Sequence, residues 1–473
     1  MNLKSSNRGK LKSKSVFVCQ QCGKESPKWL GHCPDCGTWN SFVETAVSPY
    51  RASYSRPALK ANKPQELSTV ERSTLSRLSV GFSEINRVLG GGLVPGSVVL
   101  IAGEPGIGKS TLLLQASAMI AKDKRPTCYI SGEESVNQVK LRAERLNIDG
   151  EGLFFLSEAD MAIIMEHLEQ ISPKLVVIDS IQTMYLEDIS GMPGSVSQVR
   201  ECASRIMRWA KENDVPVLLT GHVTKDGSIA GPGTLEHIVD VVLYFEGAPF
   251  SSYRMLRGIK NRFGSTNEVG LFEMGNSGLV EVDNPSQALL SRHTDATVGS
   301  VVVPTLEGSR PLLVELQALT TPNNFGPPRR IANGVDFNRL LLIIAVLTKR
   351  AGLRLFNQDV IVNVTGGLRL NEPAIDLGIA LAIASSFSDR VPISGSIVLG
   401  EIGLNGELRT VPQVERRIAE AARLGFKTCL LPKPSQKPML NHADIQLLES
   451  NSLGQALRLG LTKKISRETI NGE

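Results

Sequence analysis

The sequence predicts an α/β protein: a parallel sheet covered by helices on both faces, with a small cysteine-rich module before it and a separate α+β domain after it. Three observations carry this prediction. Continuous apolar runs alternate with helical patterns from residue 97 to residue 221, as they do in parallel sheets buried on both faces. Four of the seven cysteines lie within residues 19–36. A hairpin-like pattern starts afresh after residue 284, and helical patterns follow around 336–351 and 373–388.

Length and composition define the class of protein. A chain of 473 residues is too long for one hydrophobic core and should divide into about two to four domains. Its 41% hydrophobic and 21% charged residues are ordinary for a soluble globular protein, and a net charge of +5 is too small to identify a nucleic-acid partner. The longest apolar block, residues 340–347, is far shorter than the roughly 20 residues of a membrane span. The basic first 15 residues have no apolar segment behind them and are no secretory signal, so we expect a cytoplasmic protein with no membrane partner.

Two C-x-x-C pairs lie near the start of the chain, at Cys19 and Cys22 and at Cys33 and Cys36. Each pair presents two thiolates to one point, and two pairs complete a tetrahedron around Zn2+. Disulfides or a redox motif are the alternatives, but disulfides fit poorly with a cytoplasmic chain and a redox motif needs only one pair. The pattern therefore predicts a structural zinc site, in which four thiolate ligands leave no open position for chemistry.

Changes in composition along the chain predict its domain boundaries. The stretch after the cysteines is rich in Ser, Pro, Ala and basic residues and lacks apolar periodicity, which is typical of a linker. We predict a four-cysteine zinc finger at 1–45, a linker at 46–66, the α/β domain at 67–284, the α+β domain at 285–464 and a tail at 465–473.

A nucleotide-binding motif lies between a predicted strand and a predicted helix. The residues "GEPGIGKST" at 103–111 match G-x4-G-K-[ST], follow the run "SVVLIAG" and open the helical pattern "LLLQASAMIA". In such a loop, backbone N–H groups and the helix N-terminus bind the phosphates of ATP. We expect Lys109 to reach the β- and γ-phosphates, and Ser110 to ligate Mg2+. The predicted ATP-binding residues of the loop are Gly103, Glu104, Pro105, Gly106, Ile107, Gly108, Lys109, Ser110 and Thr111.

Polar residues follow the other predicted strands. "LVVIDS" ends its apolar run in Asp179, which suits a residue that holds the water shell of Mg2+. "YISGEES" ends in Glu133 and Glu134, and one carboxylate can polarise an attacking water; we assign this catalytic role to Glu133. The alternative interpretation of these acids is the ordinary preference for Glu at a helix N-terminus. His222 follows a fourth strand and is either a sensor of the γ-phosphate or a structural residue.

These motifs resemble those of a known family. The order of phosphate-binding loop, glutamate, strand-end aspartate and polar residue is similar to the RecA-like ATPase core. The chain also resembles the bacterial RadA (Sms) recombination family. The motifs that carry this resemblance follow the four-cysteine finger and are "LGGGLVPGSVVLIAGEPGIGKST", "YISGEES", "GSVSQVRE", "HVTKDGSIAGPG" and "KNRFG". The resemblance implies a DNA-dependent ATPase and helicase that drives branch migration of recombination intermediates, as a hexameric ring on single-stranded DNA, with the RecA recombinase. A non-translocating, ATP-switched DNA clamp or recombination mediator is the alternative.

Two loops line the central channel of RecA-like rings, and by resemblance they are residues 186–201 and 224–237 here. Both are rich in Gly and Ser, and Arg200 and Lys225 offer positive charge for a DNA backbone. The alternative is an ordinary surface loop, since neither segment carries the aromatic platform on which many single-strand binders stack bases.

Lys260 and Arg262 stand two apart in "KNRFG", within a run that is typical of strand and turn. On a strand this spacing points both side chains to one face. The pair is either the solvated surface of an edge strand, where charge discourages stray pairing, or a pair of catalytic cations. An ATPase of this core places its site at a subunit border, where cations neutralise the transition state of phosphoryl transfer. We therefore expect both residues to reach the γ-phosphate of the adjacent subunit.

The last domain resembles the proteolytic domain of Lon. "GGLRLNEPAIDLGIALAIAS" corresponds to the stretch with the nucleophilic serine, and "GEIGLNGELRTVPQVERRIAEA" to that with the catalytic lysine. The correspondence places Asp376 at the serine position and Glu415 at the lysine position. A serine–lysine dyad needs a hydroxyl and an amine, and two carboxylates supply neither. The domain should therefore be inactive as a peptidase and act in oligomerisation or DNA binding, which argues against an ATP-dependent protease.

Overall fold

The computed structural model describes residues 14–19, 24–35, 37–47, 66, 76–123, 125–222, 234–247, 252–290, 297–323, 326–433 and 445–462. The chain forms two compact units. The first holds residues 1–246, 255–266 and 274–280, and the second holds residues 247–254, 267–273 and 281–473.

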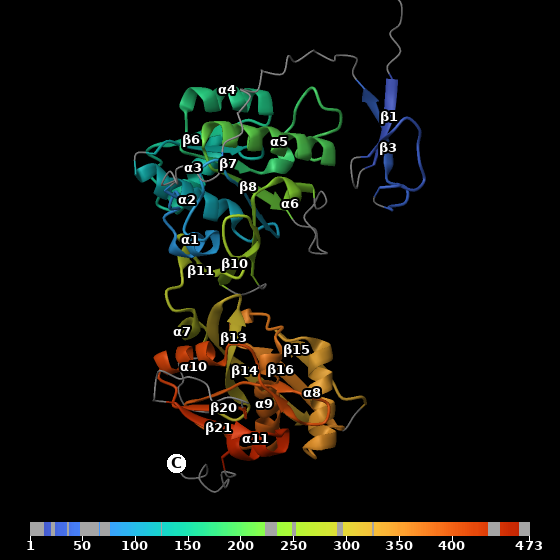
Figure 1. Cartoon of the computed structure of the whole chain (residues 1–473), viewed down its shortest axis with the longest axis vertical. Helices are drawn as coiled ribbons and strands as arrows, with labels where there is room; N and C mark the ends of the chain where they lie inside the picture. Colours follow the sequence, from blue (N-terminus) through green and yellow to red (C-terminus); the bar gives the residue numbers. More distant parts are fainter. Residues whose placement is uncertain are drawn as a thin grey trace, which may run out of the picture. The chain divides into compact units, whose positions relative to one another are not determined.

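The N-terminal ribbon is a three-stranded antiparallel sheet with the order β2-β1-β3 (Figure 1). Its strands are β1 (Lys14–Cys19), β2 (Glu25–Ser26) and β3 (Phe42–Val47). Cys19, Cys33 and Phe42 form its buried centre, and partly buried Phe17 and Leu30 pack against them. A core of this size is too small to stabilise a domain alone, which is the situation in which small modules depend on a bound metal.

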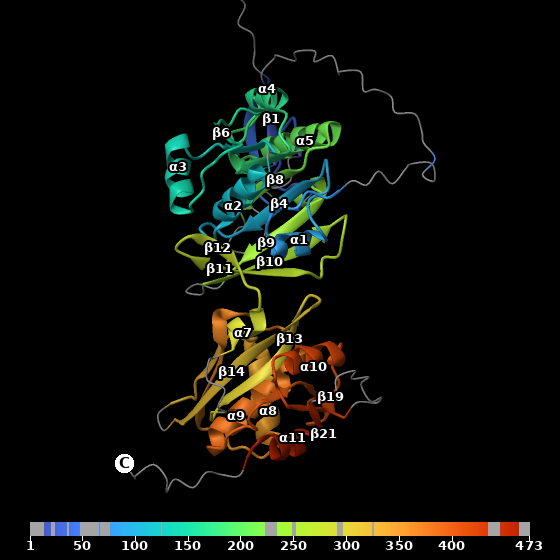
Figure 2. The same ribbon diagram turned by 90° about the vertical axis from the view of Figure 1, so that its left-hand side faces the viewer.

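A nine-stranded sheet with the order β12-β11-β10-β9-β4-β8-β7-β5-β6 forms the centre of the ATPase-like part (Figure 2). The strands from β9 to β6 in this order are parallel, and β10 is antiparallel to β9. The bounds are β4 (Val98–Gly103), β5 (Thr127–Ser131), β6 (Leu153–Ser157), β7 (Leu175–Asp179), β8 (Val217–His222), β9 (Val241–Glu246), β10 (Tyr253–Asn261), β11 (Val269–Gly275) and β12 (Gly278–Glu281).

Helices alternate with the parallel strands, as the sequence predicts. They are α1 (Ser83–Leu89), α2 (Lys109–Lys122), α3 (Val136–Arg145), α4 (Met161–Ile171), α5 (Val196–Asn213) and α6 (Thr234–Ile238). Every residue of β4 and of β5 is buried, because both faces of these central strands are covered. Parallel strands bring their carboxyl ends to one edge of the sheet, so the residues that follow β4, β5, β7 and β8 come together there.

The second unit is built on a seven-stranded sheet with the order β15-β16-β14-β13-β17-β20-β21, and a two-stranded sheet, β18-β19, accompanies it. The hairpin predicted after residue 284 is present, since β13 and β14 pair antiparallel from Ser300 to Gln317. The strands are β13 (Ser300–Glu307), β14 (Arg310–Pro322), β15 (Arg330–Asn333), β16 (Gln358–Val364), β17 (Ser396–Val398), β18 (Glu401–Ile402), β19 (Leu408–Arg409), β20 (Thr428–Pro432) and β21 (Gln446–Ser450).

The helices of the second unit include the two that the sequence predicts, α8 (Phe337–Arg350) and α9 (Asp376–Ser388). The first ten residues of α9 are buried, because its sequence is apolar on all sides. Gly378 allows α9 to lie close to β13, since a Cβ there would overlap the side chain of Val303. The other helices are α7 (Pro285–Leu289), α10 (Val414–Arg423) and α11 (Leu453–Gly460). In the described part of the chain, no helix is long and apolar enough to span a membrane.

Candidate active site

The phosphate-binding loop joins β4 to α2. Gly108 has a positive φ of 113°, a conformation that would strain any residue with a side chain, so glycine is favoured here. Lys109 is the first residue of α2 and is 5% exposed. Its Nζ donates hydrogen bonds to the carbonyl oxygens of Gly103 at 2.8 Å and of Glu104 at 2.9 Å. The lysine is thus folded onto its own loop, at the N-terminus of α2, where a helix can bind an anion.

Two carboxylates act on the Lys109 ammonium. Burial lowers the pKa of Lys109 from its ordinary value, and the negative charges of Asp179 and Glu133 oppose that shift. The charges that the sequence places after three separate strands therefore meet at one edge of the sheet. Ser110 and Thr111, in the first turn of α2, are partly buried beside this lysine. The donor set of a hydroxyl and a carboxylate next to a phosphate cradle suits Mg2+, which prefers oxygen ligands.

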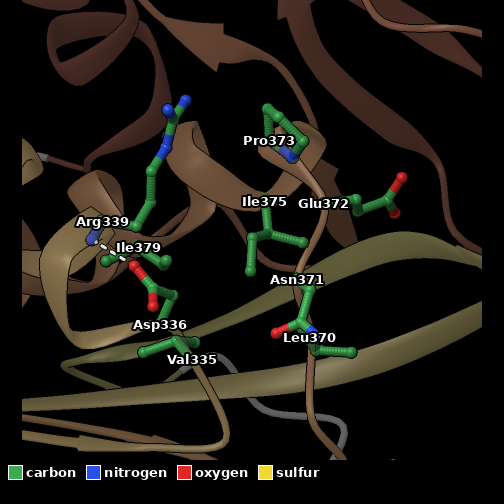
Figure 3. Close-up of a pocket in the computed structure, with 9 residues that line it drawn as sticks. All are labelled: Val335, Asp336, Arg339, Leu370, Asn371, Glu372, Pro373, Ile375 and Ile379. Atoms are coloured by element: carbon green, nitrogen blue, oxygen red, sulfur yellow. Dashed lines mark hydrogen bonds between the residues drawn. The ribbon is translucent and has the colours of Figure 1, made fainter. Parts of the chain in front are cut away.

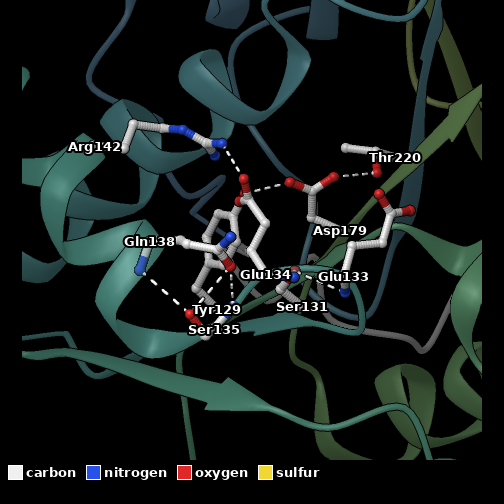
Figure 4. Close-up of polar contacts among 9 residues, drawn as sticks. All are labelled: Tyr129, Ser131, Glu133, Glu134, Ser135, Gln138, Arg142, Asp179 and Thr220. Atoms are coloured by element: carbon white, nitrogen blue, oxygen red, sulfur yellow. Dashed lines mark hydrogen bonds and ion pairs between the residues drawn. The ribbon is translucent and has the colours of Figure 1, made fainter.

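Asp179, at the end of β7, is held by two hydroxyl groups (Figure 4). Tyr129 Oη donates to one carboxylate oxygen at 2.6 Å, and Thr220 Oγ1 donates to the other at 2.7 Å. Tyr129 is fully buried, and burial followed by the charge of Asp179 holds the pKa of this tyrosine well above its ordinary value. The phenol therefore stays protonated and serves as a donor.

The structure separates the roles of the two adjacent glutamates. Glu134 forms an ion pair with Arg142 of α3 (Figure 4), so its charge is neutralised within the fold. Glu133 accepts a hydrogen bond from Ser180 Oγ at 3.0 Å and is one of the two charges that act on Lys109. Of the two carboxylates, Glu133 is therefore the one whose charge acts on Lys109 and is not paired with Arg142; its catalytic role stays a prediction.

The sequence does not reveal the residues that hold these carboxylates. Tyr129 and Thr220 lie within apolar strands and Ser180 follows Asp179 directly. A polar side chain inside an otherwise apolar run is the one signal that could have identified them, because a buried hydroxyl needs a partner. The hydrogen-bond partners of these hydroxyl groups lie in other strands, so a local sequence pattern cannot predict which residues they are.

Lys260 and Arg262 both bind the segment 236–240, which runs from α6 to the start of β9. Lys260 Nζ donates to the carbonyl oxygens of Glu236 at 2.5 Å and of Val239 at 2.8 Å. Arg262 Nη1 lies 3.3 Å from Oδ1 of the buried Asp240. The expectation that both cations lie on one strand is wrong in part: β10 ends at Asn261, and its register shifts between Gly258 and Lys260.

The edge-strand interpretation of this pair is also wrong, because β10 lies between β9 and β11 in the sheet. Both neighbouring strands satisfy its backbone, so charge is not needed there to prevent stray pairing. Instead, Lys260 binds the carbonyls of Glu236 in the short helix α6 and of Val239 just after it, and α6 contains the last residues of the second predicted DNA-facing loop.

The first predicted DNA-facing loop is fixed at its base by Gln198. This side chain is 2% exposed and bonds the backbone N–H and C=O of Leu186 at 2.9 and 3.0 Å, as well as the carbonyl of Ile189 at 2.7 Å. Beyond this anchor, residues 191–194 are exposed. Arg200 is exposed on α5, Lys225 lies outside the described residues, and His222 is described only as the last backbone position of β8.

Two of the four predicted zinc ligands are described. Cys19 and Cys33 are both fully buried in the centre of the ribbon, and Gly37 has a positive φ of 73° at the turn after the second cysteine pair. Cys22 and Cys36 lie outside the described residues. The described thiols converge from two separate segments, as a four-thiolate site requires.

The region that resembles a protease site contains an ion pair instead, and Figure 3 shows the pocket beside it, with Arg339 among the lining residues. Asp376 is fully buried, pairs with Arg339 of α8 through two hydrogen bonds and accepts a third from the N–H of Ile402 at 3.1 Å. Glu415 is exposed on α10. A cavity of about 280 Å3 adjoins the pair, and no serine, cysteine or lysine is among its described lining residues: Val335, Asp336, Arg339, Leu370, Asn371, Glu372, Pro373, Ile375 and Ile379.

Three family models match the chain. One described as "AAA domain" matches residues 62–228, one described as "Rubredoxin metal binding domain" matches residues 17–44, and one described as "Subunit ChlI of Mg-chelatase" matches residues 341–435. The second match contains all four clustered cysteines. Together with the sheet topology, these matches confirm the predicted fold class: a RecA-like P-loop ATPase core between an N-terminal ribbon of the zinc-binding type and a C-terminal Lon-protease-like domain.

Curated relatives match over nearly the whole chain. It is 50% identical over 454 residues to "DNA repair protein RadA" of Bacillus subtilis (strain 168). This match covers 95% of this chain and 99% of the Bacillus protein. It is 51% identical to the protein of the same name from Halalkalibacterium halodurans, again over 95% and 99% of the two chains. The Listeria monocytogenes protein of that name is 48% identical, over 96% of this chain and 99% of its own.

Proposed function

Because the chain belongs to the RadA family of DNA repair proteins, we propose that it is a DNA-dependent ATPase and helicase that drives branch migration of recombination intermediates. An ATP-hydrolysing domain follows from family membership and from the AAA match. The observation that supports the proposal most is the meeting of Lys109, Glu133 and Asp179 at the carboxyl edge of parallel strands. In the proposed motor, hydrolysis of ATP at this site would drive the movement of the protein along DNA.

The residues of the site would divide the reaction among them. Lys109 would turn from its loop carbonyls to the β- and γ-phosphates, and Ser110 and Asp179 would hold Mg2+. Bound Mg2+ neutralises charge on the phosphate oxygens. Glu133, held by Ser180, would orient the attacking water and accept its proton. His222, at the end of the neighbouring strand β8, would sense the γ-phosphate.

We propose that hydrolysis is completed across subunits of a hexameric ring. Lys260 and Arg262 would leave the segment 236–240, which they bind in the single chain, and stabilise the transition state in the adjacent subunit. Since that segment includes the last residues of the second predicted DNA-facing loop, DNA bound by Arg200 and Lys225 would release the cations. This gives a physical route from DNA binding to faster hydrolysis.

The other two parts would act as supports. Zn2+ bound by Cys19, Cys22, Cys33 and Cys36 would fold the ribbon and take no part in catalysis. The Lon-like domain would be inactive as a peptidase, which is supported by the Arg339–Asp376 ion pair at the place of the nucleophile. It would serve oligomerisation or DNA binding, in a cytoplasmic protein that works with the RecA recombinase.

One experiment tests the proposal. ATP turnover is measured with and without single-stranded DNA, alongside unwinding of a forked duplex by the same preparation. A motor should show DNA-stimulated turnover and strand separation that stops when ATP is replaced by a non-hydrolysable analogue. DNA-stimulated turnover without any strand separation would contradict the helicase and identify an ATP-switched clamp. Cleavage of an unfolded protein substrate would contradict the assignment of the Lon-like domain.

A further inference from the structure

We propose that the N-terminal ribbon is itself a binding site for single-stranded nucleic acid, in which Trp29 and Trp39 are the surfaces on which unpaired bases stack. The chain has three tryptophans. Trp209 is buried in the ATPase part at 6% exposure, whereas Trp29 is 52% exposed and Trp39 is 71% exposed. Indole rings are normally buried or placed at interfaces, so two exposed rings on so small a module indicate a ligand.

Both rings are held in place by the ribbon. Trp29 Nε1 donates to the carbonyl oxygen of Phe42 at 3.1 Å, and the six-membered ring of Trp29 lies 3.6 Å from the position of a Cβ on Gly31. Trp39 pairs with His32 through the backbone, and the centres of their rings are 4.9 Å apart at 58°. Each ring is therefore held by one of two neighbouring residues, Trp29 by Gly31 and Trp39 by His32. Rings fixed in advance lose little conformational entropy when a base stacks on them.

The surroundings of the tryptophans favour nucleic acid over protein. Lys28, next to Trp29, is exposed, and Lys24 forms only an exposed ion pair with Asp35, at 3.1 Å, which a phosphate can replace at small cost. Aromatic faces next to cations are the combination that single-strand binders use. Besides the two tryptophans, Val43 is the one large exposed apolar side chain in the described part of the ribbon, so there is no broad apolar patch of the kind that protein partners cover.

The ribbon would supply what the ATPase loop lacks. Residues 186–201, the described DNA-facing loop, contain no phenylalanine, tyrosine or tryptophan. That loop can follow the phosphate backbone but cannot stack bases, whereas the ribbon can hold the bases of unpaired strand. Binding at the ribbon does not depend on ATP, so it can be tested separately from the proposed motor.

The test uses the full chain with the substitution Trp209→Phe. Trp209 Nε1 is buried without a hydrogen-bond partner in the described structure, so this change breaks no hydrogen bond. The emission that remains then comes from Trp29 and Trp39. Without nucleotide, an oligo(dT) strand should quench this emission, because stacking bases contact the indoles directly. An abasic strand of the same length and charge should leave it unquenched, and equal quenching by both strands would overturn the proposal.

Affinity for oligo(dT) is then compared among ribbon variants in the same background. Trp29→Ala and Trp39→Ala should each weaken binding by about 5- to 100-fold, as expected for the loss of one stacked base. Trp29→Phe and Trp39→Phe keep an aromatic face and should bind within a few-fold of the parent. Zinc content checks that each ribbon is folded. If zinc-loaded alanine variants bind oligo(dT) as tightly as the parent, the proposal fails and the exposed rings serve a protein partner.

Discussion

The Tyr129 hydroxyl donates a hydrogen bond to the Asp179 carboxylate over a distance of 2.6 Å. Tyr129 lies in β5 and Asp179 ends β7, so this contact joins two neighbouring parallel strands. Thr220 of β8 donates to the other carboxylate oxygen at 2.7 Å. The carboxylate is therefore oriented from both sides, and each oxygen keeps a lone pair that would accept from a water of the proposed Mg2+ site.

Tyr129→Phe removes one of these donors and keeps the shape of the buried ring. We expect the Mg2+ concentration for half-maximal binding of a fluorescent, non-hydrolysable ATP analogue to rise about tenfold, since a hydrogen bond to a charged group contributes about 1.5–3 kcal/mol. Tyr185→Phe is the matched control, because the charged neighbours of Tyr185 are Asp160 and other acids rather than Asp179. A lower Tm with an unchanged Mg2+ midpoint would mean that the contact stabilises only the fold.

The adjacent glutamates provide a matched pair for the chemical step. Glu133→Gln should retain ATP binding and lower kcat at least about 100-fold, since a general base contributes about 100- to 10,000-fold. Glu134→Gln removes the charge that pairs with Arg142 and should lower Tm while leaving kcat within a few-fold. Single-turnover hydrolysis separates the chemical step from product release. The assignment would be reversed if Glu134→Gln were the variant that lost turnover.

Mixed rings test whether the cations act across subunits. Lys109→Ala and Arg262→Ala chains should each lack DNA-stimulated ATP turnover. Lys109→Ala removes the contact with the phosphates, and Arg262→Ala removes the charge that stabilises the transition state. When the two chains are mixed, some borders join an intact phosphate-binding loop to an intact Arg262, so part of the turnover should return. Arg257→Ala is the control, because Arg257 pairs with Glu246 on the neighbouring strand.

Verified mixed rings without any turnover would contradict action in trans. Normal DNA-stimulated turnover by Arg262→Ala alone would exclude a catalytic role for this residue altogether.

The ion pair in the Lon-like domain should matter for stability. Arg339→Ala leaves the fully buried Asp376 without its cation, and we expect a loss of about 3 kcal/mol, since removal of one partner strands a buried charge. Arg409→Ala removes one partner of an exposed pair, with side chains 59% and 37% exposed, and should cost less than about 1 kcal/mol. Hydrogen exchange of the α9 amides reports both changes locally. Equal rates of amide exchange in the two variants would contradict the prediction that Arg339→Ala leaves the buried Asp376 carboxylate without a cation.

Local patterns in the sequence were sufficient to place the candidate site residues that each follow one strand end. The phosphate-binding loop, Asp179 at the end of β7 and Glu133 after β5 were all predicted, because a buried strand followed by a polar turn is visible within about ten residues. Prediction was poorer at "KNRFG". There the register shift in β10 and the position of this strand inside the sheet cannot be read from spacing.

By itself the sequence determined the three-part fold class, with its P-loop ATPase core and its N-terminal ribbon of the zinc-binding type. The tertiary structure alone decided which groups hold the Asp179 carboxylate. Tyr129 and Thr220 are 50 and 41 residues away from Asp179 along the chain, and only strand order and register bring them to it. It also decided that Asp376 pairs with Arg339, 37 residues earlier, since a buried carboxylate must find a cation wherever packing places one. Periodicity is a local property of the chain, whereas the pairing of buried polar groups depends on the whole fold.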